Sequence, residues 1–332
     1  MIKKLDLKDR IFVAGSTGMA GSAICQELLN KGYGNKKFGG ELLIPNSKEL
    51  NLLDSEKVSS WFKKNKPSVV ILAAAKVGGI FANQSQPASF LLENIKIQTN
   101  VIESAWKYGT KRLLFLGSSC IYPKFSKQPI KEEYLLKGEL ESTNEWYAIA
   151  KIAGIKLCES LRIQHNFDAI SLMPTNLYGP GDNYHPQNSH VMAALIKKFY
   201  DAKKTSSKSV ICWGSGSPLR EFMHVRDLGS AAVYLLENWD LNNNEAPLDN
   251  KNNPISYLNV GTGLDISIKK LAEKIAHFTE FKGEIIWDKT KPDGTPKKQL
   301  NIDKIRSLGW EPKIKLDDGI KETINNYIEH FS

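Results

Sequence analysis

Two hydroxyls and a thiol lie side by side in the segment GSSCIYP, directly after the apolar run RLLFL. Ser118, Ser119 and Cys120 therefore stand where a buried strand is expected to end. A serine at such a place can donate a hydrogen bond to a substrate carbonyl. Taken alone, a cysteine there is more often a small buried apolar residue than a reactive group. The segment predicts a carbonyl-binding site and leaves the role of the thiol open.

A tyrosine and a lysine four positions apart follow in NEWYAIAKIAG. Tyr147 and Lys151 would share one face of a helix, one turn apart. A phenol has an ordinary pKa near 10, and an ammonium group nearby favours the phenolate and makes proton exchange useful. The same spacing joins Tyr33 to Lys37, but that pair lies in the glycine-broken loop KGYGNKK and is not expected to be catalytic.

The segment GSTGMAG follows the first apolar run and opens a helical pattern. Gly15, Gly18 and Gly21 permit a tight turn, and backbone N–H groups and the helix dipole can then approach a pyrophosphate. Its position before a β-α-β series predicts a dinucleotide loop, whereas a plain strand-to-helix turn is the alternative. Lys151 would then also hydrogen-bond the nicotinamide ribose.

The end of the second expected strand, ELLIPNSKEL, indicates which nicotinamide cofactor binds. NAD-binding sites place an acid there for the ribose hydroxyls, but no carboxylate precedes Glu49. The segment therefore favours NADP, with Ser47 and Lys48 as candidates to hold the extra phosphate. Asp54 is expected to face the adenine amine, to cap the next helix, or to do both.

The elements that must position these residues alternate along the first half of the chain. The expected strands are RIFVAG, ELLIP, SVVILAAA, RLLFLGSS and AISLMPTNLYGP. The helical segments between them are AGSAICQELLNKG, DSEKVSSWFKKNKP and ASFLLENIKIQTNVIESAWKYG. The alternation predicts an α/β fold with a Rossmann-type, doubly wound parallel sheet and ligand sites at the carboxyl ends of the strands.

The second half is less regular, with a strand-like SVICWG, a helix expected from Val225 and a last helix from Leu316. We expect residues 1–177 to form the NADP-binding domain, with some later segments returning to it. Residues 178–332 are expected to form mainly a smaller, partly interleaved α/β lobe that binds the substrate.

Composition restricts the class of protein. The chain has 332 residues, 41% of them hydrophobic, and a formal charge of +9, which suits polyanionic ligands but also reflects lysine spread throughout. The cysteines are far apart, without zinc-site spacing, and are expected to be reduced. With no signal-peptide core and no apolar run of about 20 residues, we expect a cytoplasmic protein that neither spans a membrane nor binds nucleic acid.

The glycine loop with Ser118, Tyr147 and Lys151 resembles the extended short-chain dehydrogenase/reductase family. Between Ala73 and Pro296 the chain is more narrowly similar to the GDP-L-fucose synthase family. The segments that carry this resemblance are AAAKVGGI, FLGSSCIYPK, YAIAKIAGIKLCES, MPTNLYGP, NSHV, WGSG, REFMHV and KPDGTP.

This resemblance implies a reaction. Enzymes of that family invert C3 and C5 of GDP-4-keto-6-deoxy-mannose and then reduce the C4 ketone with NADPH. The ketone acidifies the hydrogens on both neighbouring carbons, so inversion needs one group to remove a proton and another to return it. The resemblance assigns that pair to Cys120 and His190, and the reductase triad to Ser118, Tyr147 and Lys151. Neither Cys120 nor His190 has metal-ligand spacing, so no metal is expected.

The resemblance also implies binding positions, among which Arg220 suits a diphosphate because a guanidinium forms paired hydrogen bonds to phosphate oxygens. The expected substrate positions are Ser118, Ser119, Cys120, Asn176, Lys198, Trp213, Arg220 and Asp293. The expected cofactor positions are Gly15, Ser16, Thr17, Gly18, Met19, Gly21, Ser47, Lys48, Asp54, Ala73, Ala74, Leu116, Tyr147, Lys151, Pro174, Asn176, Leu177 and His190. A homodimer through the long helices around Ile95 and Tyr147 is the family expectation.

The chain departs from the family at Ser16, Thr17 and Pro45, where members commonly carry a histidine, an arginine and a basic residue. NADPH preference is then expected to be weaker or to depend on Lys48.

Three other functions stay open from the sequence. The first is a C4 reductase of another GDP-4-keto sugar, for example a heptose, with an idle Cys120 and His190. The second is an NAD-dependent sugar-nucleotide 4-epimerase. The third is a catalytically silent dinucleotide-binding protein on the same fold.

Overall fold

A six-stranded parallel sheet forms the centre of the computed structural model, which describes residues 3–185, 189–291 and 293–331. The strand order is β2-β1-β3-β4-β5-β9. The strands are β1 (Arg10–Ala14), β2 (Glu41–Leu43), β3 (Val69–Leu72), β4 (Arg112–Leu116), β5 (Ala169–Pro174) and β9 (Tyr257–Val260). The strands expected from the first four apolar runs are confirmed. The fifth run forms two strands, β5 in this sheet and β6 (Asn176–Tyr178) in another, and β9 joins the central sheet from the second half of the chain.

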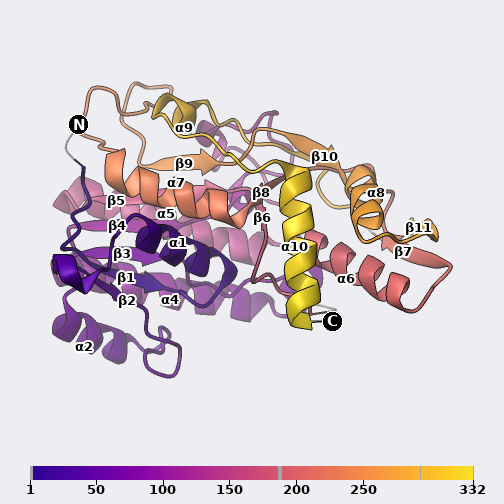
Figure 1. Cartoon of the computed structure of the whole chain (residues 1–332). Coiled ribbons are helices and arrows are strands. Elements are labelled where there is room, and N and C mark those ends of the chain that lie inside the picture. Colours follow the sequence, from indigo (N-terminus) through magenta and orange to yellow (C-terminus); the bar gives the residue numbers. More distant parts are fainter. Residues whose placement is uncertain (1–2, 186–188, 292, 332) are drawn as a thin grey trace.

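Helices cover both faces of this sheet, as in a doubly wound fold. Figure 1 shows α1 (Met19–Asn30) and α7 (Val225–Asn238) in front of the sheet. Behind it, drawn fainter, α4 (Pro87–Lys107) packs against α5 (Glu145–His165), and α2 (Ser55–Asn65) packs against α4. The short helix α3 (Ile80–Ser85) leads into α4. Because helices cover both faces, strands of this sheet need apolar side chains on both sides. Every residue of β3 and β4 is buried, in agreement with their nearly continuous apolar sequence.

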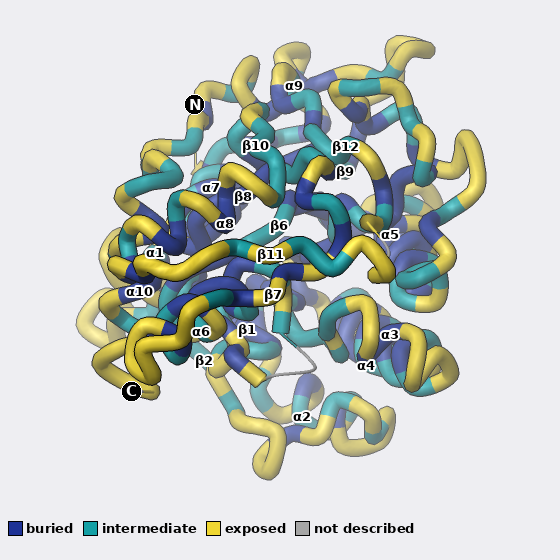
Figure 2. Tube along the Cα trace, turned by 90° about the vertical axis from the view of Figure 1, so that its right-hand side faces the viewer, coloured by how far each residue is buried: buried dark blue, intermediate teal, exposed yellow. Residues whose placement is uncertain are grey.

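The smaller part of the molecule joins two short sheets. In one, β8 (Leu219–His224) pairs with β6 (Asn176–Tyr178), β10 (Asp265–Ser267) and β12 (Lys297–Lys298). The other pairs β7 (Ser209–Trp213) with β11 (Glu284–Asp288) at the surface, where Figure 2 shows β11 exposed or intermediate. The helices are α6 (Val191–Lys204), α8 (Ile268–Phe278) and α10 (Leu316–Phe331), and α9 (Asp303–Ser307) lies near β9. The helices expected from Val225 and Leu316 are confirmed.

Two hydrophobic cores accompany these two parts. The core of the large sheet includes residues from α7, β9 and α9, so the chain returns to it after the smaller part has begun. The second core gathers buried side chains of α6, α8 and α10. A single boundary near residue 177 stays a prediction.

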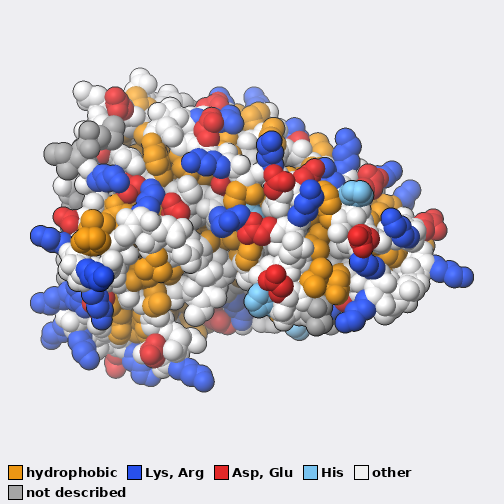
Figure 3. All heavy atoms as spheres, viewed as in Figure 1, with side chains coloured by type: hydrophobic (Ala, Val, Ile, Leu, Met, Phe, Trp, Pro, Cys, Tyr) orange, Lys and Arg blue, Asp and Glu red, His pale blue; other side chains and the backbone are white. Residues whose placement is uncertain are grey.

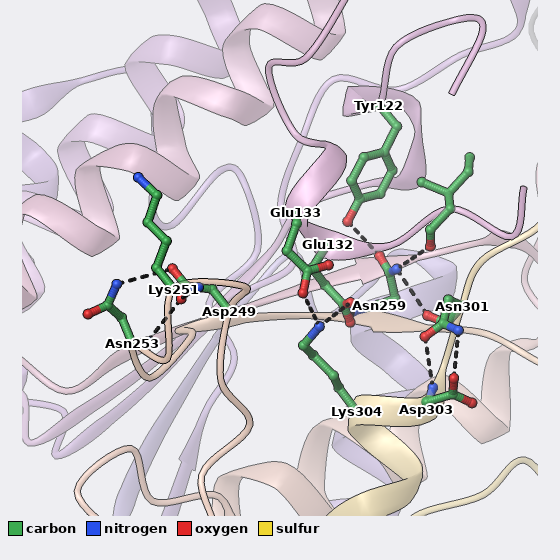
Figure 4. A network of polar contacts seen from close by, with 11 residues as sticks. Tyr122, Glu132, Glu133, Asp249, Lys251, Asn253, Asn259, Asn301, Asp303 and Lys304 are labelled. Carbon is green, nitrogen blue, oxygen red and sulfur yellow. Dashed lines mark hydrogen bonds and ion pairs between the residues drawn. The ribbon is translucent and has the colours of Figure 1, made fainter. Parts of the chain in front are cut away.

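Segments distant in sequence are tied together at Asn259 of β9, whose side chain is fully buried. Its Oδ1 accepts from the Tyr122 hydroxyl at 2.6 Å, and its Nδ2 donates to the carbonyls of Ile130 and Asn301 at 2.9 and 3.0 Å. Figure 4 shows Asn259 between Tyr122 and Asn301, with Glu132 beside it. Glu132 Oε1 accepts from the Asn259 backbone N–H at 3.0 Å. One side chain thus holds the loop after β4, the following segment and the chain after β12.

Replacing Asn259 with alanine should destabilise the protein strongly. The Tyr122 hydroxyl and two carbonyls would lose their partner in the interior, which should lower the free energy of unfolding by about 3 kcal/mol. Urea unfolding followed by circular dichroism measures this loss. The control is Asn253→Ala in the exposed loop of Figure 4, which should change the same quantity by less than about 0.5 kcal/mol. Equal unfolding midpoints for the two variants would contradict this account.

Candidate active site

The glycine loop fits tightly between β1 and α1. Gly15 has a φ of +84°, and a Cβ there would lie 2.7 Å from the Ala74 backbone nitrogen after β3. A Cβ on Gly21 would lie 2.1 Å from the carbonyl oxygen of Gly15. Helix α1 begins after Gly18, and no side chain caps its first N–H groups. The loop lies at the boundary between β1 and β3, where the strand order of the sheet reverses. The backbone N–H groups at the start of α1 fit a dinucleotide pyrophosphate.

The loop after β2 presents exposed side chains beside this turn. Asn46 Oδ1 accepts from the Lys48 backbone N–H at 2.9 Å, and the Asn46 N–H donates to a Glu49 carboxylate oxygen at 2.8 Å. Ser47 and Lys48 are exposed. Figure 3 shows Lys and Arg gathered at the end of the molecule that holds α2. The exposed side chains of Ser47 and Lys48 could therefore reach a phosphate, and this contact stays a prediction.

Asp54 acts as the N-cap of α2. Its Oδ1 accepts from the Lys57 backbone N–H at 3.0 Å, which confirms the capping role. The adenine contact predicted for it stays a prediction.

Ser118 holds the cysteine in place at the end of β4. Its Oγ accepts from the Cys120 backbone N–H at 3.1 Å and caps the short 3-10 helix η2 (Ser119–Ile121). Ser119 is buried, whereas Ser118 and Cys120 are half-buried. Cys120 is therefore not a fully buried apolar residue, and both Cys120 and Ser118 are partly accessible to solvent.

Tyr147 and Lys151 of α5 lie beside this turn. Lys151 is buried, and its Nζ donates to the Leu116 carbonyl at 2.7 Å and lies 5.8 Å from the centre of the Tyr147 ring. Burial lowers the pKa of Lys151 to about 7. Burial, and then the charge of Cys120, raise the pKa of Tyr147, while the Ser118 hydroxyl acts in the opposite direction. The expected lowering of the phenol pKa by Lys151 is wrong for this structure, because burial dominates and the ammonium is held on a carbonyl.

The Tyr33–Lys37 pair is excluded from this site. The Tyr33 side chain is buried, and its hydroxyl donates to Glu237 at 2.7 Å. A buried Tyr33 hydroxyl bound to Glu237 agrees with the prediction that this pair is not catalytic.

Two cations from other parts of the chain face Cys120. Lys298 Nζ lies 3.5 Å from the Cys120 sulfur. In the pairing of β12 with β8, Lys298 stands opposite Arg220. Burial raises the pKa of Cys120, but Lys298, the Ser118 hydrogen bond and Arg220 together outweigh it and leave the pKa below its ordinary value. Sequence reasoning missed Lys298, because Lys297 and Lys298 have no local feature that separates them from solvated lysines.

The remaining substrate positions line the outer part of the smaller lobe. Trp213 is 60% exposed, which excludes the alternative that it belongs to the core. Its ring centre lies 5.6 Å from Lys198 Nζ and 5.6 Å from Lys291 Nζ. Asp293 accepts from the Ser215 N–H at 2.7 Å and from the Ser215 hydroxyl at 2.8 Å. An aromatic surface with cations and one carboxylate suits a nucleotide base and its phosphates.

His190 lies on a different segment from Cys120. It precedes α6 and is exposed, although the surrounding protein still lowers its pKa through burial. A Cβ on Gly79 would lie 2.8 Å from the Ser189 carbonyl, so the loop after β3 contacts the residue before His190. In the part of the chain that the structure describes, no hydrogen bond or ion pair joins His190 to Cys120. Their shared role stays a prediction.

The positions expected near the nicotinamide lie at strand ends and in β6. Leu116 ends β4, Pro174 ends β5, and Leu177 is half-buried in β6. Asn176 Nδ2 donates to the Glu221 carbonyl at 2.7 Å, which fixes its side chain beside β8. Asn188 of NSHV and Pro292 of KPDGTP, two of the segments that carried the resemblance, lie outside the described residues.

Among the described residues, no group of three or more His, Cys, Asp or Glu side chains is arranged to hold a metal ion. Likewise, none of the described helices combines the length and apolar character needed to cross a membrane.

The chain is similar to a known family and to proteins of known name over most of its length. Residues 11–246 match the NAD dependent epimerase/dehydratase family. The chain is 50% identical over 325 residues to GDP-L-fucose synthase 1 of Arabidopsis thaliana, which covers 98% of this chain and 95% of the relative. It is 47% identical over 323 residues to the GDP-L-fucose synthase of Escherichia coli (strain K12), covering 97% and 98%.

A solved structure resembles the whole fold. The GDP-mannoheptose C4 reductase from Campylobacter jejuni with NADP bound superimposes with a TM-score of 0.86 at 36% identity, covering 98% of this chain and 99% of that one. With the glycine loop, the Ser118–Tyr147–Lys151 site and these matches, the chain belongs to the NAD dependent epimerase/dehydratase family and, within it, to the GDP-L-fucose synthase family.

Proposed function

We propose that the protein converts GDP-4-keto-6-deoxy-D-mannose to GDP-L-fucose by 3,5-epimerisation and NADPH-dependent 4-reduction. The observation that carries this proposal is the contact between the two halves of the machinery. Ser118 Oγ accepts from the Cys120 backbone N–H, and both the Ser118 hydroxyl and the charge of Cys120 act on the pKa of Tyr147. The Cys120 thiol, which can accept and donate a proton, therefore lies next to the Ser118 and Tyr147 hydroxyls, which would hold the ketone. The GDP-L-fucose synthases of Arabidopsis and Escherichia coli support the substrate.

The residues divide the reaction between them. Ser118 and Tyr147 hydrogen-bond the C4 oxygen and stabilise the enolate that forms when a neighbouring carbon loses its proton. The Cys120 sulfur accepts that proton, and His190 returns one to the opposite face. Tyr147 finally donates a proton to the C4 oxygen when the ketone is reduced. Arg220 holds the diphosphate.

The cofactor in this proposal is NADP(H), which supplies a hydride to C4 when bound. The uncapped start of α1 would hold its pyrophosphate, and Lys151 would hold the nicotinamide ribose. Ser47 and Lys48 would hold the 2'-phosphate in place of the basic residues that Ser16, Thr17 and Pro45 replace. The heptose reductase with NADP bound supports the choice of cofactor.

The direct test is turnover of GDP-4-keto-6-deoxy-D-mannose with NADPH in D₂O. Absorbance follows cofactor oxidation, and NMR of the product reads C3, C4 and C5. We expect oxidation of NADPH and deuterium at both C3 and C5, since both inversions exchange a carbon-bound hydrogen with solvent. Oxidation without deuterium would contradict the epimerase half, and no oxidation would contradict the substrate.

A second candidate function is reduction at C4 of a GDP-4-keto-heptose without epimerisation. The likeness to the Campylobacter jejuni GDP-mannoheptose C4 reductase favours it. That chain is 36% identical to this one, whereas the GDP-L-fucose synthase of Escherichia coli is 47% identical. The heptose is therefore the substrate to try if the hexose fails.

Lys48 should decide between NADPH and NADH. Lys48→Ala should raise the KM for NADPH about tenfold, which corresponds to about 1.4 kcal/mol, a value near the lower end for a hydrogen bond to a charged group. The KM for NADH should stay unchanged, because NADH lacks the phosphate. The control is Lys63→Ala on the exposed surface of α2, which should change neither value. An equal effect of Lys48→Ala on both cofactors would show that it does not contact the phosphate.

We infer further that the enzyme is a cytoplasmic homodimer. All cysteines are free, which suits a reducing compartment. Helices α4 and α5 pack together and carry exposed Leu92, Trp146 and Ile163, which a second copy would cover.

A further inference from the structure

The contact between Lys298 and Cys120 depends on an arrangement built around β12. Lys297 and Lys298 pair with Leu219 and Arg220 of β8. The chain then continues along residues 128–130: the Gln299 N–H donates to Gln128 Oε1 at 2.9 Å, and the Ile130 N–H donates to the Gln299 carbonyl at 2.7 Å. The backbone on both sides of Lys298 is therefore fixed.

A buried carboxylate anchors the same segment. Glu221 of β8 is fully buried, and its Oε2 accepts from the Leu300 N–H at 2.7 Å. Its Oε1 accepts from the N–H groups of Thr262 and Gly263 at 2.5 and 2.9 Å. Glu221 thus joins the chain after β12 to the turn before β10, which limits how far Lys298 can move from Cys120.

Among the described residues Lys298 has no acidic partner, and its Nζ has its polar contact with the Cys120 sulfur at 3.5 Å. The neighbouring Lys297 differs, because its Nζ pairs with Asp265 of β10 at 3.2 Å. Successive side chains of a strand point in opposite directions, so the Lys297 ammonium meets Asp265 whereas the Lys298 ammonium meets Cys120. A half-buried ammonium held against a thiol, without a carboxylate, suits an anionic sulfur.

We propose that Lys298 is the positioning residue that keeps Cys120 as a thiolate, so that the sulfur can accept a proton from the carbons beside the ketone. The consequence for catalysis rests on the proposed function, whereas the ion pair itself does not. In the step, the C–H bond breaks, an S–H bond forms, and the electron pair moves into the enolate on the C4 oxygen. Lys298 keeps its own proton throughout.

The other charges around Cys120 act in both directions. Arg220 from β8 supports the thiolate, and Tyr147 from α5 would oppose it if ionised. The same small recess is lined by Lys124, Glu141 and Lys297, and Glu141 is neutralised by Lys124 at 3.1 Å. The lowered pKa of Cys120 means that the thiolate is present at a lower pH than for an ordinary thiol, and it is lost as pH falls.

The test is the rate at which iodoacetamide alkylates Cys120 as a function of pH, measured on the Cys120 peptide by mass spectrometry. Only the thiolate reacts. Lys298→Met keeps most of the length of the side chain and removes its charge, and it should raise the pH midpoint by about one unit or more, as expected for loss of an opposite charge at this distance. Lys298→Arg should restore the midpoint, and Lys297→Met should leave it unchanged.

The result that overturns the proposal is a Lys298→Met midpoint equal to that of the natural chain. If Lys298 served only the substrate diphosphate, Lys298→Met would raise the KM for the GDP-sugar and leave the midpoint where it is. Failure of the proposed function looks different: the midpoint shifts in Lys298→Met, yet the natural chain places no deuterium at C3 or C5 of the product. Thermal unfolding by circular dichroism confirms that each variant is folded.

Discussion

The parallel pairing of β12 with β8 is the constraint on which the rest of the site depends. The pair is short, and Glu221, Gln128 and Asn259 hold its surroundings in place. It brings the segment with Lys298 to the carboxyl end of β4, where Cys120 lies in the short helix η2. Without this pairing, the thiol would face neither Lys298 nor Arg220, and burial alone would make it an ordinary inert cysteine.

The site combines proton transfer and carbonyl reduction because both need the same polarised ketone. Ser118 links the two: its Oγ accepts from the Cys120 backbone N–H, and its hydroxyl counteracts the rise of the Tyr147 pKa. Lys151 is buried with a pKa near 7 and is held by the Leu116 carbonyl. Lys151 thus holds the end of β4, and its contact with the ribose stays a prediction, while Lys298 is the largest of the influences that lower the pKa of Cys120.

Local signals predicted much of this. The apolar runs predicted strands of the central sheet, the glycine spacing predicted the tight turn before α1, and the spacing of Tyr147 and Lys151 predicted that both lie on one helix. Each of these signals lies within about one strand or one helical turn. The proposed roles of Cys120 and His190 came from the family resemblance and not from a local sequence pattern. Lys298 had no such signal, because its role arises from pairing with a strand far away in sequence. The direction of the Tyr147 pKa also depended on burial, which spacing does not reveal.

The most direct test of the central claim, that the Cys120 sulfur moves the protons of epimerisation, is the deuterium content of the product made by Cys120→Ser in D₂O with NADPH. A serine hydroxyl is far less acidic than this thiol, so deuterium at C3 and C5 should fall by about 100-fold or more, as expected for loss of a general base. NADPH oxidation should continue, since Ser118, Tyr147 and Lys151 are intact. Full labelling at both carbons in Cys120→Ser would contradict the account.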